Sequence, residues 1–336
     1  MKNQNLISLQ ILRCIASTSV VYFHVGCATN KISFGSFGVD IFFVLSGFIM
    51  AMITSQNREP AVFAINRISR VAPMYWVITS FLIISSFLYK EKGTGIINFE
   101  NSLKSLFFIP YLRPDGTVYP ILAPGWTINY EMFFYIVILF SFFLPVKISA
   151  LSSSGLLVAA FLFSRYTDNS LLQAFFGNSI IFEFIIGILT YYAFRHYHPI
   201  KIRPSILIVL ILVCYASLVL AELNQGFNLP RFVAFGPLSA VFLVGLIWLE
   251  EEIRMKSSFM YRALAKMGDA SFATYLTHSI LLKFIFDAKS GQNYSALYVV
   301  ATIAAILLFG QLAYYFIDLP LSKYTRGKLL GFYYKI

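Results

Sequence analysis

The chain contains ten apolar stretches of roughly the length that crosses a lipid bilayer, and this repetition constrains its fold more than any other feature. A helix through the hydrocarbon core needs about 20 mostly apolar residues. Only 12% of the 336 residues are charged and 58% are hydrophobic, which leaves too few polar side chains to coat a water-exposed domain. We therefore predict an all-α integral membrane protein with about ten transmembrane helices. The predicted spans are residues 7–27, 38–56, 73–89, 126–144, 148–164, 171–194, 205–221, 232–249, 270–286 and 295–317.

The distribution of basic residues predicts the orientation. The chain has 26 Lys and Arg against 15 Asp and Glu, a net charge of +11. If the N-terminus is cytoplasmic, that side of the membrane receives 16 of the basic residues and the opposite side receives 8. Because cytoplasmic loops are enriched in Lys and Arg, this split predicts that both termini are cytoplasmic. It also accounts for most of the positive charge, so no nucleic acid partner is needed to explain it.

The connection at residues 90–125 is too long for a simple turn, and it is predicted to face the outside. Its segment 105–112 is aromatic but too short to span the bilayer. This pattern is typical of a helix that lies at the interface or of a re-entrant segment, and it would suit the mouth of a substrate site. The sequence shows no internal repeat, so we interpret residues 1–336 as a single transmembrane domain.

An ionisable side chain inside a span costs at least about 2.5–3.5 kcal/mol on insertion scales, so each one needs a reason. The first span carries two, Arg13 and His24, which are eleven residues apart. That spacing puts them within about 20° of one helix face and about 16 Å apart along its axis. The face would present a cation in the cytoplasmic half and a titratable imidazole in the outer half. Alternatively, Arg13 reaches the inner headgroups and His24 bonds a neighbouring helix.

Two acidic residues are predicted at a depth comparable to that of His24. Asp40 enters the second span from the outside, and Glu131 enters the fourth span from the same side. Either carboxylate could hold the second ring nitrogen of His24, which fixes the tautomer and raises the basicity that a general base needs. The sequence does not choose between them. Asp40 has a further alternative as an acid in the first turn of its helix.

Two arginines lie three residues apart on the cytoplasmic side, between the second and third spans. Arg67 and Arg70 would face the same way on a helical turn, which is a geometry suited to binding phosphate groups. The alternative is that they only contribute to the positive charge of the cytoplasmic loops.

Six motifs occur in order along the chain, and each is weak on its own. They are Arg13-x10-His24, the segment Phe37–Phe48, Arg67-x-x-Arg70-x-x-Pro73-x-Tyr75-Trp76, the segment Trp126–Tyr135, Tyr275-Leu276-Thr277-His278 and Asp318-Leu319-Pro320. Together they resemble the acyltransferase family 3 of integral membrane proteins, whose members O-acylate cell-surface glycans in bacteria. Two positions depart from the family pattern, since Asn129 replaces a usual Ser and Asp318 a usual Glu.

The resemblance implies transfer of an acyl group from a cytoplasmic donor, most often acetyl-CoA, to a glycan outside. On this hypothesis Arg67 and Arg70, with Arg13 deeper in the membrane, bind the CoA phosphates. His24 takes the proton of a sugar hydroxyl as general base, or alternatively forms an acyl-His intermediate. Asp40 and Glu131 join the catalytic group. Trp126, Tyr275 and His278 are expected to line the site.

The expected partners follow from the same resemblance. Acyl-CoA is a co-substrate, and no tightly bound cofactor or metal is expected, because the three cysteines have no metal-ligand spacing. The acceptor would be an exopolysaccharide, an O-antigen or a lipid-linked saccharide at the bacterial cytoplasmic (inner) membrane, with polysaccharide biosynthesis machinery as a further partner. A succinyl donor is an alternative within the family. From another class, a polytopic transporter or glycan exporter would also carry ionisable residues in its spans.

Overall fold

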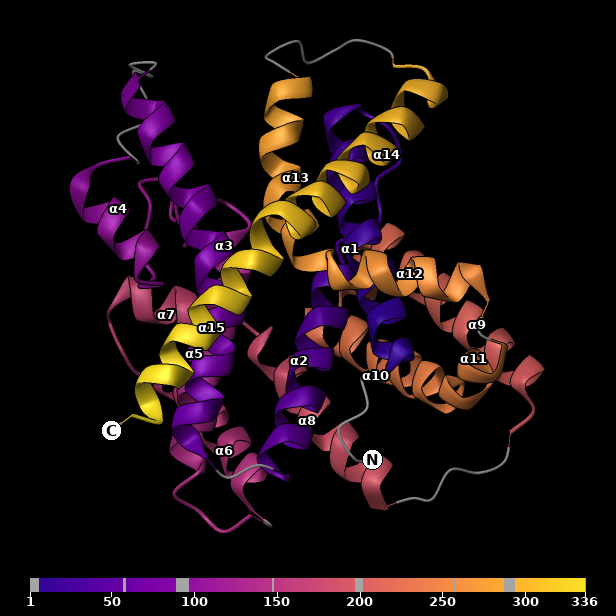
Figure 1. Ribbon diagram of the computed structural model, residues 1–336, viewed down its shortest axis with the longest axis horizontal. Coiled ribbons are helices and arrows are strands. Elements are labelled where there is room, and N and C mark those ends of the chain that lie inside the picture. The colour runs from indigo at the N-terminus through magenta and orange to yellow at the C-terminus, as the bar shows by residue number, and fades with distance from the viewer. Residues whose placement is uncertain are drawn as a thin grey trace. The chain divides into compact units, whose positions relative to one another are not determined.

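The computed structural model describes residues 6–56, 59–88, 97–146, 148–196, 202–256, 258–286 and 294–335, and every regular element in these ranges is a helix (Figure 1). The chain divides into two compact units. One comprises Met1–Met52 with Phe182–Tyr314, and the other Ile53–Ile181 with Tyr315–Ile336. The all-α prediction is therefore confirmed for the described residues.

The first unit is built around its N-terminal helix. Helix α1 (Ile7–Ala28) contacts α10, α11, α12, α13 and α14 within this unit (Figure 1). The other helices of the unit are α2 (Gly38–Thr54), α8 (Ile181–His196), α9 (Pro204–Leu223), α10 (Arg231–Trp248), α11 (Glu250–Lys256), α12 (Phe259–Asp269), α13 (Ser271–Ile285) and α14 (Ala296–Ala313). Because α1 carries Arg13 and His24, the centre of this unit is also where the sequence predicts the site.

Glycines allow helices of the first unit to approach closely. A Cβ atom on Gly47 of α2 would lie 2.1 Å from the carbonyl oxygen of Phe184 on α8, and one on Gly187 of α8 would lie 2.0 Å from that of Val44. No side chain fits at either position. Small residues at helix contacts are typical of membrane proteins, where backbone packing holds helices together.

The second unit is organised around the long helix α3 (Pro60–Leu88), which contacts α4, α5 and α15. The remaining elements are α4 (Phe99–Leu106), α5 (Gly125–Ser141), α6 (Ser149–Phe163), α7 (Ser170–Phe176) and α15 (Leu319–Tyr333), with a π-helical turn η2 (Tyr314–Asp318) before α15. Figure 1 shows α15 running alongside α3.

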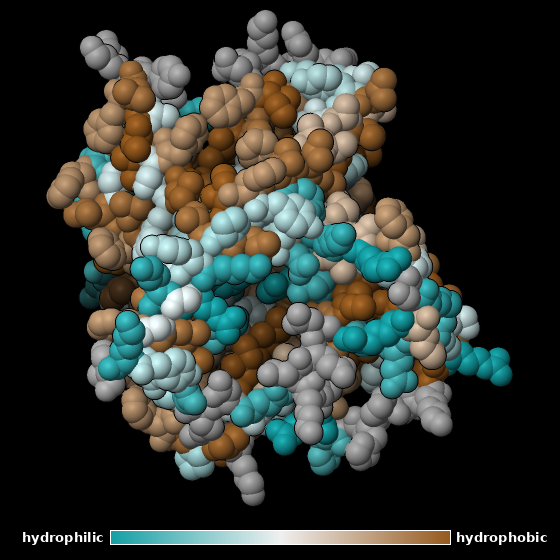
Figure 2. Space-filling model, in the orientation of Figure 1, coloured by the Kyte–Doolittle hydropathy of each residue, from teal (hydrophilic) through white to brown (hydrophobic). Residues whose placement is uncertain are grey.

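Several helices are long and apolar enough to cross a membrane. Among the described residues there are six such segments, namely Ile7–Ala28, Pro60–Leu88, Ser170–His196, Pro204–Leu223, Arg231–Trp248 and Ala296–Tyr333, and two shorter apolar helices, Gly38–Thr54 and Ser149–Phe163. In the first unit, Figure 2 shows hydrophobic residues over α14 and hydrophilic residues over α12. The presence of membrane-spanning helices agrees with the sequence analysis. The count of about ten and the cytoplasmic location of both termini stay predictions.

Three predicted spans differ from the helices. The span predicted at 171–194 covers two helices, α7 and α8, with residues 177–180 between them. The third span is predicted to start at Pro73, but α3 begins at Pro60 and carries Pro73 in its interior. The proline removes one backbone hydrogen bond, a cost that transmembrane helices tolerate when neighbouring groups satisfy the backbone. The last span is predicted to end at residue 317, but the chain continues helically through η2 to Tyr333.

The long connection at 90–125 is described from residue 97, so residues 90–96 lie outside the described ranges. Its aromatic segment folds against α3. The Tyr75 hydroxyl donates to the carbonyl oxygen of Ser105 at 3.0 Å, and the Trp76 indole donates to that of Leu106 at 2.7 Å. The rings of Tyr75 and Phe108 lie 4.8 Å apart. Whether the segment lies at the membrane interface or enters the membrane stays a prediction.

Candidate active site

Helix α1 presents the two residues that the sequence analysis placed on one face. The helix is unbroken from Ile7 to Ala28, which is the condition for the eleven-residue spacing to align Arg13 with His24. Arg13 is half-buried, whereas His24 is exposed. An exposed imidazole on a largely buried helix is accessible to a reacting group.

A second histidine lies against His24. The ring centroids of His24 and His278 are 4.9 Å apart, and the ring planes are inclined by 35°. His278 lies on α13 and is 1% exposed, so the pair consists of one accessible and one buried imidazole. The structure thus brings together two of the residues that the sequence predicted for the site, on helices far apart in the chain.

Tyr275 completes this part of the site. Its backbone carbonyl oxygen lies 2.5 Å from Nδ1 of His278, and its ring centroid lies 5.6 Å from that of His278. The ring of Phe42 on α2 contacts Tyr275 in turn, at 6.2 Å. These contacts place α13 and α2 around the histidine pair within the first unit.

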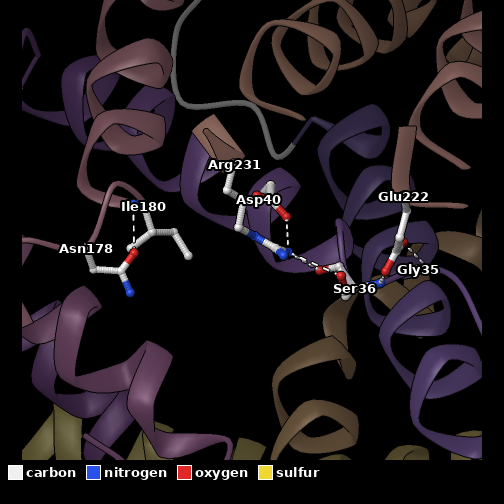
Figure 3. A network of polar contacts seen from close by, with 7 residues as sticks. All are labelled: Gly35, Ser36, Asp40, Asn178, Ile180, Glu222 and Arg231. Atoms are coloured by element: carbon white, nitrogen blue, oxygen red, sulfur yellow. Dashed lines mark hydrogen bonds and ion pairs between the residues drawn. The ribbon is translucent and has the colours of Figure 1, made fainter. Parts of the chain in front are cut away.

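Asp40 is held by a basic partner that the sequence analysis did not single out. Oδ2 of Asp40 lies 2.6 Å from Nη2 of Arg231, the first residue of α10 (Figure 3). The same Nη2 donates to the carbonyl oxygen of Ser36 at 3.0 Å and to its hydroxyl oxygen at 3.3 Å. The side chain of Asp40 is fully buried, and that of Arg231 is 37% exposed. Asp40 therefore pairs with Arg231 among the described residues, and its predicted role beside His24 stays a prediction.

The network of Figure 3 continues to a glutamate on α9. The Glu222 carboxylate accepts the backbone N–H groups of Gly35 and Ser36 at 2.6 and 3.0 Å. Arg231 thus donates to the carbonyl oxygen of Ser36, and Glu222 accepts the N–H group of the same residue, in the short segment that leads from α1 into α2. This arrangement fixes the segment that follows the His24-bearing end of α1.

Glu183 on α8 is the second buried acid near Asp40. It is 0% exposed, and its carboxyl group interacts with that of Asp40. Among the described residues, Arg231 is the cation that interacts with both buried carboxyl groups. Arg231 immediately precedes the predicted span at 232–249 and is one of the eight basic residues that the sequence analysis assigned to the outer side. A sequence signal for this arginine exists, because two acids, Asp40 and Glu183, lie within predicted spans and no basic residue was assigned to pair with them.

In the second unit, Arg67 and Glu131 are linked through one tyrosine. The guanidinium carbon of Arg67 lies 6.0 Å from the ring centroids of both Phe63 and Tyr135, a cation–π arrangement. The Tyr135 hydroxyl donates a hydrogen bond to Glu131. Nε of Arg67 is buried and has no hydrogen-bond partner among the described residues. Tyr135 was not singled out from the sequence, although it lies in the motif that contains Glu131.

Arg70 forms an ion pair with the acid of the last motif. Its Nη1 lies 2.8 Å from Oδ2 of Asp318, whose side chain is fully buried. The hydroxyl of Ser322 donates to the other oxygen of Asp318 at 3.3 Å. This pair joins α3 to the start of α15, so two motifs from opposite ends of the sequence meet. The role of Arg70 in binding phosphate stays a prediction.

Trp126 lies at the start of α5 in the second unit. It is half-buried, and its ring packs against those of Tyr119 and Tyr130, with centroids 6.2 and 5.9 Å away. Tyr130 in turn stacks on Phe175 at 4.4 Å. Trp126 therefore belongs to an aromatic cluster that includes Tyr119 of the connection at 90–125.

The family model for an acyltransferase domain matches residues 6–315. The chain belongs to this acyltransferase family. It is a multi-pass membrane protein, as the family and its apolar helices indicate. This match includes His24 and His278 and the three arginines Arg13, Arg67 and Arg70, and it ends just before Asp318.

The curated relatives agree with the family. The chain is 28% identical to the exopolysaccharide production protein ExoZ of Rhizobium meliloti, over 91% of this chain and 96% of that protein. It is 25% identical to the peptidoglycan O-acetyltransferase OatA of Listeria monocytogenes, and 21% identical to a putative O-acetyltransferase of Staphylococcus aureus. These two alignments cover 94% and 93% of this chain but only 56% of each relative, so the chain spans about half of their length. No solved structure matches the chain.

Proposed function

We propose that this protein transfers an acetyl group from cytoplasmic acetyl-CoA to a hydroxyl group of a glycan on the outer side of the membrane. Membership of the acyltransferase family supports the reaction class. The names of two relatives, one an O-acetyltransferase and the other a protein of exopolysaccharide production, support an acetyl group and a saccharide acceptor. The observation that carries the proposal is the exposed imidazole of His24, paired with buried His278 at the centre of a membrane-embedded unit.

In this mechanism His24 is the general base. Its free ring nitrogen takes the proton of the acceptor hydroxyl as the hydroxyl oxygen attacks the thioester carbonyl carbon. The new C–O bond forms, the C–S bond breaks, and the departing thiolate receives the proton from His24. The reaction therefore releases CoA and needs no net proton. The competing route, with an acyl-His24 intermediate, predicts a trapped acyl group when the acceptor is withheld.

In this proposal, three arginines bind the acyl-CoA donor. Arg67 suits a phosphate because aromatic rings hold its guanidinium carbon while Nε has no hydrogen-bond partner in the part of the chain that the structure describes. Arg70 contributes charge to the same helical turn while it binds Asp318. Arg13, on the helix that carries His24, would bind a deeper part of the donor.

The topology completes the proposal. With both termini cytoplasmic, Arg67 and Arg70 lie on the side where acetyl-CoA is made, and His24 lies towards the outer side. The proposed location is the bacterial inner membrane, where lipid-linked or polymeric saccharides become accessible to the enzyme together with their biosynthesis machinery. Accessibility labelling of single cysteines introduced at Lys31 and at Arg326 tests this orientation. External labelling of the first alone supports it, and the opposite pattern contradicts it.

The deciding experiment measures CoA release by the purified protein in lipid nanodiscs, with and without a polysaccharide acceptor from the producing cells. We expect acceptor-dependent CoA release and acetylated acceptor by mass spectrometry. The His24→Ala variant should lose both while its abundance in the membrane stays normal. Undiminished acetylation by this variant contradicts the role of His24. Saccharide movement across vesicles without CoA release would instead assign a transporter, and release from succinyl-CoA alone would assign a succinyltransferase.

A further inference from the structure

The tautomer of His278 follows from one backbone contact. Its Nδ1 lies 2.5 Å from the carbonyl oxygen of Tyr275, and a carbonyl oxygen only accepts hydrogen bonds. Nδ1 must therefore carry the proton. In a neutral imidazole the other nitrogen, Nε2, is then an acceptor with a free lone pair.

Nothing in the described chain uses that lone pair. Nε2 of His278 is buried and has no hydrogen-bond partner among the described residues, and the residue is 1% exposed. Buried polar atoms are nearly always paired, so an orphaned acceptor calls for a partner. The ring of His24, which also carries an N–H donor, lies 4.9 Å away, measured between centroids, and no hydrogen bond joins the two rings in this structure.

We propose that His278 is a positioning residue whose Nε2 accepts a hydrogen bond from the ring N–H of His24 when the exposed His24 ring rotates towards it. This bond assigns the proton of His24 to the nitrogen nearest His278 and leaves the lone pair of the other nitrogen for the substrate hydroxyl. A carboxylate usually has this role. Here the buried carboxylate of α2, Asp40, is paired with Arg231, and His278 takes this role.

The pair also stabilises the protonated state of His24. When His24 takes the hydroxyl proton it becomes an imidazolium, and its N–H to His278 becomes a charge-assisted hydrogen bond, which is stronger than a neutral one. The proton then passes from His24 to the departing thiolate, and the bond to His278 returns to its neutral form. This inference rests on the proposed function, because it gives His278 its role in that reaction.

The competing interpretation is structural. The bond from Nδ1 to Tyr275 lies within one turn of α13, and it would hold the His278 ring whether or not Nε2 has a function. The two interpretations differ at a single atom, Nε2. Substitution by asparagine retains an N–H near the position of Nδ1 and removes the acceptor. Substitution by glutamine places an amide oxygen near the position of Nε2.

The test compares His278→Asn and His278→Gln with the wild type, as full-length proteins in nanodiscs, by steady-state kinetics with acetyl-CoA and the polysaccharide acceptor. We expect His278→Asn to lower kcat on the order of 100-fold, in the range of general-base effects, with KM for both substrates nearly unchanged. We expect kcat of His278→Gln to be at least about tenfold higher than kcat of His278→Asn. A wild-type kcat in His278→Asn, or equal losses in both variants, would overturn the proposal.

A second measurement needs no variant at position 278. The chain has four histidines, so ¹⁵N-histidine NMR of the wild type in nanodiscs gives few signals, and His24→Ala assigns those of the pair. We expect a protonated Nδ1 on His278 and a coupling across an N–H···N bond to His24. Absence of that coupling contradicts the proposal. Because the spectrum requires no turnover, it separates failure of this inference from failure of the proposed reaction, which a wild-type protein without acceptor-dependent CoA release would indicate.

Discussion

Arg231 holds Asp40 at the start of α2, with Nη2 of the guanidinium 2.6 Å from Oδ2 of the fully buried carboxylate. The same guanidinium binds Ser36, and the buried acid Glu183 adjoins the pair. Among the described residues, Arg231 therefore balances two buried acids, Asp40 and Glu183, which lie within the predicted spans 38–56 and 171–194. Such a pair is costly to break, because the partner left behind is a buried, uncompensated charge.

The first prediction concerns this pair. Arg231→Ala should destabilise the protein by at least ~1 kcal/mol, and by less than the ~3–5 kcal/mol of a fully buried pair, because the Arg231 side chain is 37% exposed. The measurement is thermal unfolding of the detergent-purified protein. The double variant Asp40→Asn with Arg231→Ala should recover part of the loss, since it removes the stranded charge. A double variant that is no more stable than Arg231→Ala would show that the ion pair is not the cause.

The second prediction concerns the contact between α2 and α8. Gly187→Ala should destabilise the first unit by at least ~1–3 kcal/mol, because the new Cβ atom would lie 2.0 Å from the carbonyl oxygen of Val44 and backbone must shift. Gly155→Ala on α6 is the matched control, since its Cβ atom would meet nothing within 4 Å. The control should be neutral or slightly stabilising. Equal unfolding temperatures for the two variants would contradict the close approach of α2 and α8.

The third prediction concerns pH and the N-terminal end of α1. The buried carboxylate of Glu250 accepts the backbone N–H groups of Ile7 and Ser8 at 3.0 and 2.7 Å. Burial raises the pKa of Glu250, but the hydrogen bonds from Ser8, Ile7 and Arg254 outweigh it, so the pKa lies below the usual 4.5. A carboxylate whose pKa is lowered by folding stabilises the folded state. This stabilisation is fully present above about pH 4.5 and is lost as the pH falls through the folded-state pKa.

Glu250→Gln should therefore unfold at a lower temperature than the wild type at neutral pH, and the difference should shrink as the pH falls below about 4.5. The measurement is the unfolding temperature of both proteins between neutral pH and about pH 3. Glu251→Gln is the matched control, since Glu251 is the next residue on α11 and is exposed. A difference between Glu250→Gln and the wild type that does not change with pH would remove the carboxylate charge as the cause.

The sequence predicted the helices better than their contacts. Apolar length placed most of the expected spans on single helices of the structure, because burial in lipid imposes that length whatever the neighbours are. The span predicted at 171–194 instead covers two helices, α7 and α8. It misplaced the start of α3, since Pro73 is tolerated within the helix. Helix contacts depend on single close approaches, such as the one at Gly187, that no local pattern specifies.

The candidate site shows the same pattern, since the sequence indicated which residues are important but not which residues they contact. The cost of placing an ionisable side chain inside a span selected His24, Asp40 and Glu131 as residues that need a reason to be there, but it did not identify their partners. Glu131 binds Tyr135 and Asp40 binds Arg231. Both partners are ordinary in the sequence, because tyrosine is common in apolar segments and an arginine at the end of a span indicates topology first.

The last prediction separates the two arginines of the α3 motif. Arg67→Ala should raise KM for acetyl-CoA on the order of tenfold and leave KM for the glycan nearly unchanged, because it removes one charge-assisted contact to a phosphate. Arg70→Ala should in addition lower the unfolding temperature, because Asp318 is fully buried and would lose the cation that lies 2.8 Å away. Adding Asp318→Asn to Arg70→Ala should restore part of that stability, and adding it to Arg67→Ala should not. Steady-state kinetics and thermal unfolding on the four proteins test both statements. If Arg67→Ala affected KM for the glycan more than KM for acetyl-CoA, Arg67 would belong to the acceptor site. If Arg70→Ala unfolded at the wild-type temperature, the ion pair between Arg70 and Asp318 would not stabilise the contact between α3 and α15.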